Sequence, residues 1–242
     1  MVAVVRLAVN DFKNIIRDKL LISLAVLYPV LLVIFSQILV QFIAPNLKGS
    51  IPLAGNFTVF FMLFVTIIPI LYGFIASFLI LDEKDEHLLT VLRVMPISRN
   101  TYLVYRMLFL TWFSFLVLLI FPPLSGLLEN TQFSYLEYVP IAVLFSLLTP
   151  FSAMLVSSFA SNKVQAFAIF KISATIYMLP LFTFLISDNW KYLFSPAPNF
   201  WGFITLREVI STGANDYVHL FIGFIYIIVL ILGLFYIFNK KN

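Results

Sequence analysis

Long apolar runs alternate with short polar segments along almost the whole chain. Crossing the roughly 30 Å hydrocarbon layer of a membrane takes about 20 apolar residues in a helix. Six runs reach that length, over about residues 20–43, 57–81, 101–121, 136–160, 164–186 and 217–238. They are too long for the alternating strands of an outer-membrane barrel. We therefore expect an all-α polytopic membrane protein whose residues 1–242 form a single transmembrane domain with six transmembrane helices.

Two segments outside these runs also have helical periodicity. Residues 1–19 alternate apolar and charged positions, which predicts an amphipathic helix in the membrane interface; a solvated helical tail is the alternative. Residues 199–210 place apolar side chains at helical spacing beside Arg207 and Glu208, as an interfacial aromatic anchor would. Within the first run, Pro29 is expected to bend the helix and free a main-chain carbonyl for a neighbour.

A charged island, residues 81–107, separates the second run from the third. It begins with an acidic cluster around Lys84 and continues with the apolar positions Leu88, Leu89, Val91, Leu92 and Met95, ending at Pro96. This pattern predicts a short amphipathic helix outside the hydrocarbon whose apolar face needs a partner. The alternative is a loop helix that rests on the membrane, with charges that only mark one side of it.

Composition supports the membrane class and removes several kinds of chemistry. With 62% hydrophobic and 11% charged residues and a mean hydropathy of +1.05, the chain has more apolar surface than a water-soluble core can bury. The absence of cysteine excludes disulfides, thiolate metal sites and thiol nucleophiles. The 15 basic against 11 acidic residues reflect loops held on the cytoplasmic side, so no nucleic acid partner is expected.

The distribution of basic residues predicts the orientation. Six spans place both termini on one side of a cell (plasma) membrane, and the first run is too long for a cleavable signal peptide. Three basic residues fall on the opposite side: Lys48, Lys191 and Arg207. Eleven fall on the terminal side: Arg6, Lys13, Arg17, Lys19, Lys84, Arg93, Arg99, Arg106, Lys163, Lys240 and Lys241. The positive-inside rule makes the termini and the island cytoplasmic.

Lys171 is a charge inside the fifth run. It lies roughly 12 Å along a helix from Lys163, so it can extend its ammonium group to the interface or face a water-filled substrate path. We keep it as a candidate residue of a translocation path. Glu137, at the outer start of the fourth run, is interpreted as an interface charge.

The island resembles a loop of type-2 ABC permeases, the membrane subunits of ATP-binding-cassette exporters. The order of acidic cluster, leucine pair, Leu92 and then Pro96-Ile97-Ser98-Arg99 before a new span is similar to the loop after their second span, which forms the coupling helix that seats in the ATPase subunit. His87 and Leu88 stand where the family usually has Gly-Thr, and Thr90 replaces a common glutamate. The resemblance implies a partner-docking set: Glu83, Asp85, Glu86, Leu88, Leu89, Leu92, Arg93 and Pro96.

The resemblance also implies partners and a direction of transport. It predicts ABC ATPase (nucleotide-binding) subunits, a second permease copy in a homo- or heterodimer, and surrounding membrane lipids. ATP and magnesium are expected on the ATPase, with no cofactor in this chain and no enzymatic activity of its own. Export of a hydrophobic drug, lipid or peptide is expected, with residues 199–210 forming short outer-leaflet helices near the substrate exit.

Two other classes of function remain open. An ion-coupled secondary transporter or channel would work without an ATPase. A lipid-modifying enzyme would need Asp82 and Asp85 to bind magnesium, which prefers carboxylate oxygens. The sequence has no G-x-x-x-x-G-K-[ST] phosphate loop and no H-E-x-x-H motif, and His87 and His219 are expected at opposite membrane faces.

Overall fold

Six helices of the structure are long and apolar enough to cross a membrane. The computed structural model describes residues 19–43, 45, 57–85, 99–129, 131–186 and 188–241, which contain helices, turns and loops but no strand. The candidate spans are Ser23–Ile43, Phe57–Asp82, Asn100–Ser125, Tyr135–Phe159, Lys163–Phe184 and Tyr217–Lys241. They confirm the expected all-α fold class. The predicted interface helix of residues 1–19 and the island helix lie outside the described residues, apart from their ends.

The spans are built from the following elements. The first span runs through α2 (Lys19–Ile22), the π-helical η1 (Ser23–Leu27), α3 (Tyr28–Ile38) and the π-helical η2 (Leu39–Ile43). The second and third are α5 (Phe57–Asp85) and α7 (Arg99–Ser125). The fourth is α8 (Tyr135–Ser146) with α9 (Leu148–Phe159), and the fifth is α10 (Lys163–Met178) with the 3₁₀ helix η5 (Leu179–Phe184). The 3₁₀ helix η6 (Asp188–Phe194) and α11 (Phe200–Thr212) precede the last span, α12 (Tyr217–Lys241).

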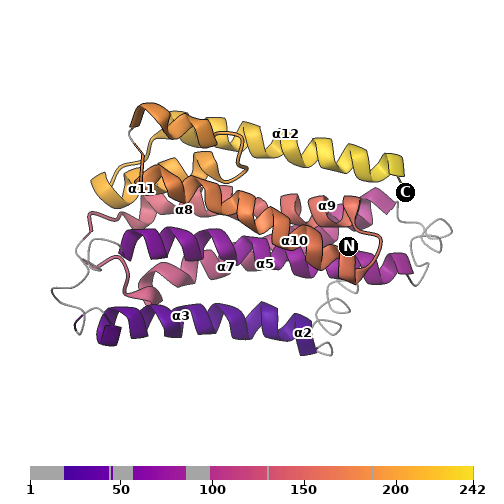
Figure 1. Cartoon of the computed structure of the whole chain (residues 1–242), viewed down its shortest axis with the longest axis horizontal. Helices are drawn as coiled ribbons and strands as arrows, with labels where there is room; N and C mark the ends of the chain where they lie inside the picture. The colour runs from indigo at the N-terminus through magenta and orange to yellow at the C-terminus, as the bar shows by residue number, and fades with distance from the viewer. Residues whose placement is uncertain are drawn as a thin grey trace.

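Helix α5 is the centre of the bundle. In its most apolar stretch 78% of the residues are buried, against 17% in the first span and 17% in α12, and Figure 1 shows α3 and α12 at opposite edges with α5 between them. α5 packs most extensively against α9 and α7. Gly73 allows the close approach of α5 to α9, because a Cβ there would lie 2.6 Å from both Ser152 Cβ and the Thr149 carbonyl oxygen.

Proline residues interrupt three of the spans. In the first, Pro29 has no N–H to donate to the carbonyl of Ala25, and the hydroxyl of Tyr72 donates to that oxygen instead, at 2.7 Å. This confirms the expectation that Pro29 frees a carbonyl for a neighbour. In the fourth, the helix breaks at Leu147, three residues before Pro150, which has no N–H to donate to the Ser146 carbonyl oxygen. The fifth changes to a 3₁₀ helix where Pro180 enters.

The two later interruptions lie close to each other in space. α9 and α10 are joined by a 2.6 Å hydrogen bond between Ser152 Oγ and the Tyr177 hydroxyl. Leu147 and Leu179, where the fourth and fifth spans change geometry, both lie on the same side of that bond, toward the α8 end of the bundle.

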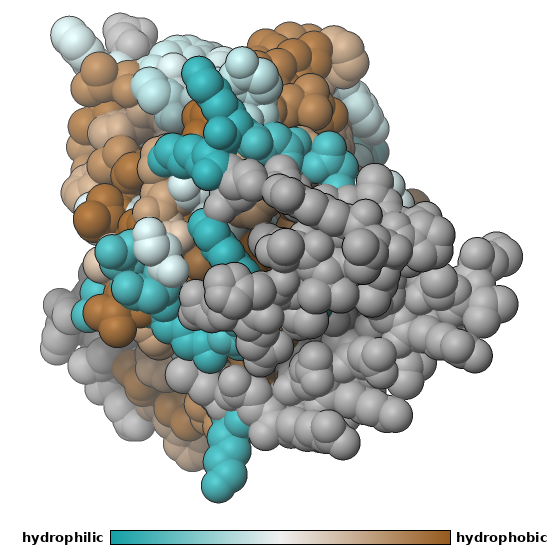
Figure 2. All heavy atoms as spheres, turned by 90° about the vertical axis from the view of Figure 1, so that its right-hand side faces the viewer, coloured by the Kyte–Doolittle hydropathy of each residue, from teal (hydrophilic) through white to brown (hydrophobic). Residues whose placement is uncertain are grey.

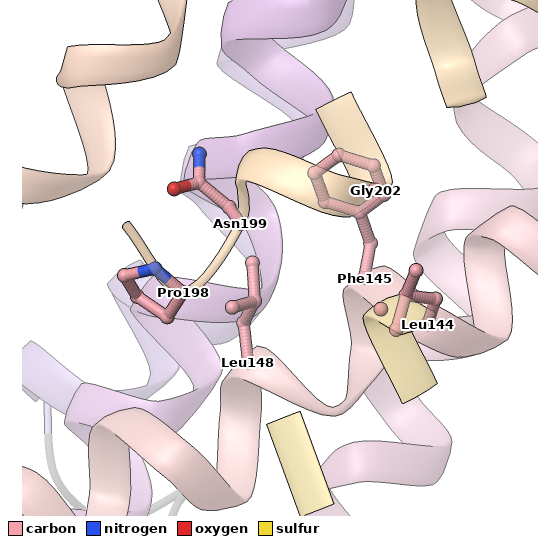
Figure 3. A pocket seen from close by; sticks show the side chains of 7 residues that line it. Leu144, Phe145, Leu148, Pro198, Asn199 and Gly202 are labelled. Atoms are coloured by element: carbon pink, nitrogen blue, oxygen red, sulfur yellow. The ribbon is translucent and has the colours of Figure 1, made fainter. Parts of the chain in front are cut away.

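The segment between the fifth and sixth spans is an integral part of the bundle. α11 packs against α8 and α12, with Phe203, Leu206 and Val209 buried. The predicted helix of residues 199–210 is therefore present. Figure 3 shows the turn before α11, at Pro198 and Asn199, beside residues of the fourth span. The cavity between them is only about 10 Å³, about the size of one water, so α11 is tightly seated.

Candidate functional site at the charged end of the bundle

Charged side chains gather at one end of the bundle. Here α5 ends, α7 begins, α9 turns into α10 and α12 ends. Figure 2 looks onto this end and shows hydrophilic residues gathered on it. The described charged residues at this end include Asp82, Lys84, Arg106, Lys163, Lys240 and Lys241. The opposite end is where α11 and the start of α5 lie (Figure 1).

Helix α5 carries the start of the island out of the apolar bundle. It continues to Asp85, and α7 begins at Arg99. Glu83 and Asp85 thus belong to the last turn of α5, as the predicted acidic stalk requires. The remaining members of the predicted docking set lie outside the described residues, so their contact with a partner stays a prediction: Glu86, Leu88, Leu89, Leu92, Arg93 and Pro96.

Asp82 joins α5 to α10. Its carboxylate lies 2.7 Å from Lys163 Nζ, and the same ammonium group lies 5.8 Å from the ring centre of Phe78. Both charged side chains are partly exposed, so the pair contributes at most about 1 kcal/mol to stability. The pair links the end of the second span to the start of the fifth. No sequence pattern predicts this pair, since the two residues belong to different spans.

Arg106 ties α7 to α5 from inside the bundle. Its side chain is only 2% exposed, and its Nη1 donates a 3.1 Å hydrogen bond to the Leu79 carbonyl oxygen. Its guanidinium carbon lies 5.1 Å from the centre of the Tyr102 ring, within the range of a cation–π contact. By sequence, Arg106 is one of the eleven basic residues assigned to the terminal side. Its position inside an apolar run was the signal that it is a buried, hydrogen-bonded group.

A third connection holds the ends of α9 and α12 together. Lys241 Nζ donates to the Ser158 carbonyl oxygen at 3.3 Å and lies 4.3 Å from the ring centre of Phe159. A cation is favourable at this position because the last carbonyls of a helix carry partial negative charge. The fourth and fifth spans form a tight hairpin. Asn162 caps the start of α10, where its Oδ1 accepts from the main-chain N–H of Gln165 at 2.9 Å.

These contacts connect the helix ends at the charged end of the bundle, which we call the platform. The second span is joined to the third by Arg106 and to the fifth by Asp82, and the fourth is joined to the sixth by Lys241. Within the described part of the chain, no three His, Asp or Glu residues are grouped as a metal site would require.

Lys171 lies apart from this platform. It is exposed on α10, in a stripe of exposed positions that also contains Val164, Phe167, Ile172, Thr175 and Ile176. Lys171 therefore lies on an outer surface of the single chain and is not part of the platform. A charge on an otherwise apolar, outward face is costly in lipid, so Lys171 either extends its ammonium group to the interface or faces an aqueous path.

Comparison with known proteins gives the family. The model of the family described as "Fluoroquinolones export permease protein Rv2686c-like" matches residues 11–235. Two relatives from Mycobacterium tuberculosis, the fluoroquinolones export permease proteins Rv2686c (strain ATCC 25618 / H37Rv) and MT2760 (strain CDC 1551 / Oshkosh), are each 30% identical over 201 residues, covering 79% of this chain and 77% of theirs. No solved structure matches. The resemblance to type-2 ABC permeases is thereby confirmed, and the chain belongs to the Rv2686c-like family of export permeases.

Proposed function

We propose that this chain is the permease subunit of an ABC exporter and is driven by separate ATPase chains. These chains would dock on the predicted set Glu83, Asp85, Glu86, Leu88, Leu89, Leu92, Arg93 and Pro96. The observation that carries the proposal is the way in which the docking loop, residues 86–98, is attached to the bundle. It connects α5 and α7 directly, and Arg106 bonds these two helices to each other less than three turns from where the loop begins. A partner that moves the loop therefore moves both helices together.

The same contacts suggest the route by which ATP would drive transport. ATP and magnesium bound on the partner would close the ATPase pair and displace the loop. Arg106 would pass that displacement to the end of α5, and the Asp82–Lys163 pair would pass it on to α10. Because α5 is the buried centre of the bundle, its movement would change the packing of α7 and α9 as well.

The path for the substrate is proposed to lie between two permease copies along the exposed stripe of α10. An apolar face with Lys171 and Thr175 would suit an amphiphilic compound better than a purely apolar one. The related mycobacterial proteins are named as exporters of fluoroquinolones, so a hydrophobic drug with polar groups is the substrate class we propose. Both termini and the docking loop would then be cytoplasmic, in a multi-pass protein of the cell membrane.

The docking loop is tested by replacing Leu89 and Leu92 together with Asp. These residues lie beyond the end of the second span, so insertion should be unaffected, whereas an apolar docking face would be destroyed. We expect the ATPase subunit to be lost from the complex purified in mild detergent, and ATP-dependent efflux to fall at least about tenfold, because several buried apolar contacts of about 1 kcal/mol or more each are removed.

A matched control places the same substitution at the opposite end of the bundle. Leu193 in η6 is 68% exposed, so Leu193→Asp should leave ATPase association unchanged. If the Leu89→Asp/Leu92→Asp protein retained its ATPase and its efflux, the loop would not be the docking site. Recovery of the wild-type chain without any ATPase, together with transport that persists after ATP depletion, would favour an ion-coupled transporter instead.

A further inference from the structure

A second feature lies at the end of the bundle opposite the charged platform. An open cavity of about 430 Å³ is formed where four separate segments meet. They are the first turn of α5, the turn before α8, the end of η5 and the C-terminal half of α11. Because these segments are far apart in sequence, only the complete fold creates this cavity.

Arg207 is the charged residue in the lining of this cavity. Its guanidinium carbon lies 4.8 Å from the centre of the Phe184 ring, so the side chain is held in place by a cation–π contact. Within the described residues, no carboxylate forms an ion pair with it, although the side chain is partly buried. An oriented, partly desolvated guanidinium without a carboxylate is suited to bind an anion from outside the chain.

The other polar groups around Arg207 are neutral hydroxyls and one amide, and none of the described residues that line the cavity is acidic. Thr131 and Ser211 are held by hydrogen bonds from their hydroxyls to main-chain carbonyls, at 2.8 and 3.0 Å. The Thr58 hydroxyl and the Gln132 amide make no hydrogen bond to other described residues, so they remain available to a ligand. Phe184 and Ile210 supply apolar surface next to these groups.

We propose that this cavity binds the acidic head group of an amphiphile, a phosphate or a carboxylate. Arg207 would bind two oxygens of the anion, as a planar guanidinium does, with Thr58 and Gln132 donating further hydrogen bonds. The apolar part of the ligand would lie against Phe184 and Ile210. The anion has two sources, an anionic membrane lipid or an acidic transported compound. This inference goes beyond the proposed exporter function, because binding needs neither an ATPase nor turnover.

Binding is measured on the purified full-length chain in neutral detergent, without its ATPase. The probes are phosphatidylglycerol, diacylglycerol with the same acyl chains, and a fluoroquinolone carboxylic acid. We expect saturable binding of at least one acidic probe and none of diacylglycerol, which lacks the phosphate. Arg207→Gln should weaken that binding at least about tenfold, since it removes a bidentate charged pair, and Arg207→Lys should retain part of it.

Lys191→Gln is the matched control. It removes the same charge at the same end of the bundle, but Lys191 lies 5.4 Å from the ring centre of Tyr192 in η6 and does not line the cavity. Its binding should equal that of the wild type. Binding of phosphatidylglycerol alone would identify a lipid site, and binding of the carboxylic acid alone a site for an acidic compound; either supports the proposal.

Two results would overturn it. One is the absence of saturable binding for every acidic probe, and the other is an equal loss in the Arg207→Gln and Lys191→Gln proteins. Should Arg207→Gln fail to fold, Thr58→Val combined with Gln132→Ala keeps the charge and removes the two available donors. That double variant should bind the acidic probe at least about threefold more weakly, and unchanged binding would contradict the proposal.

Discussion

Arg106 is a buried charge at the place where two spanning helices approach the docking loop. Leaving such a charge unpaired inside the bundle would be costly, so its hydrogen bond to the Leu79 carbonyl and its contact with Tyr102 stabilise the fold. Together with the Asp82–Lys163 pair, it defines how the loop is attached. Under the proposed function, the same side chain would stabilise the bundle and connect it to the docking loop.

Arg106→Gln separates the two roles. The substitution removes the charge and weakens the bond to Leu79, which we expect to lower the free energy of unfolding by about 1–3 kcal/mol. If Arg106 couples the loop to α5 and α7, ATP hydrolysis by the assembled complex should continue while drug efflux per ATP falls several-fold. Lys240→Gln, at the same end of the bundle, is the control. Equal loss of hydrolysis and efflux would argue that Arg106 acts through stability alone.

Asp216 fixes the start of the last span at the opposite end. Its Oδ1 accepts from the main-chain N–H groups of Val218 and His219 at 3.1 and 3.2 Å, and its Oδ2 is bonded to the ring of His219. Partial burial by itself would raise the pKa of Asp216, but the hydrogen bonds from His219 and Val218 bring the pKa below its ordinary value. Asp216 thus acts as the N-cap of α12.

Asp216→Ala should lower the free energy of unfolding by about 1 kcal/mol at neutral pH, through loss of the cap. Because the pKa is lowered in the folded protein, the ionised carboxylate stabilises the fold above its unfolded-state pKa of about 3.9, and this stabilisation is lost as the pH falls through the lower, folded-state value. Thermal unfolding in detergent at several pH values measures the difference from wild type. A gap between the two proteins that stayed constant down to the lowest pH would contradict this role.

Among whole elements, the contact of α5 with α9 holds the bundle together. It depends on a position without a side chain, Gly73, and on the polar groups of α9 that face it: the Thr149 hydroxyl donates to the Pro69 carbonyl oxygen at 3.0 Å. Pro69 lies inside a continuous α5, whereas Pro150 lies just after a helix break. The two prolines therefore have different effects on the helices that contain them.

Gly73→Ala tests this contact. The added Cβ would meet Ser152 Cβ and the Thr149 carbonyl at 2.6 Å, and overpacking of this kind costs about 1–3 kcal/mol. Gly233→Ala is a control in another span, since a Cβ there has no neighbour within 4 Å. We expect a lower thermal midpoint for Gly73→Ala and an unchanged or higher one for Gly233→Ala. Equal midpoints would mean that the two helices can separate slightly without loss.

For the molecule as a whole, the hydropathy of the sequence was enough to predict the six spans. The six spans agree with the candidate helices to within a few residues, because burial in lipid acts on each run separately. The Asp82–Lys163 pair, the buried bond of Arg106 and the Arg207 cavity were not predicted, because each needs two or more segments that only packing brings together. The docking contacts of Leu89 and Leu92 remain predictions from the sequence.

The orientation of the whole molecule is testable by chemical labelling, because the chain has no cysteine. A single cysteine at Asn242 should react with a membrane-impermeant maleimide only in inside-out vesicles, and one at Ser195 only in intact cells or right-side-out vesicles. The opposite pattern would reverse the side on which an ATPase can dock. Labelling of both sites from the same side would contradict six membrane crossings.

The central position of α5 also has a consequence for how the protein is made. The helices that cover α5 most, α7 and α9, are synthesised after it. During synthesis its surface must therefore rest against lipid, and later against protein. Its side chains, apolar on nearly all sides, are compatible with both surroundings. A polar substitution on α5 that the finished bundle could accommodate would still expose an unsatisfied group to hydrocarbon during assembly. Variants of this helix should thus reduce the yield of protein before they reduce its activity.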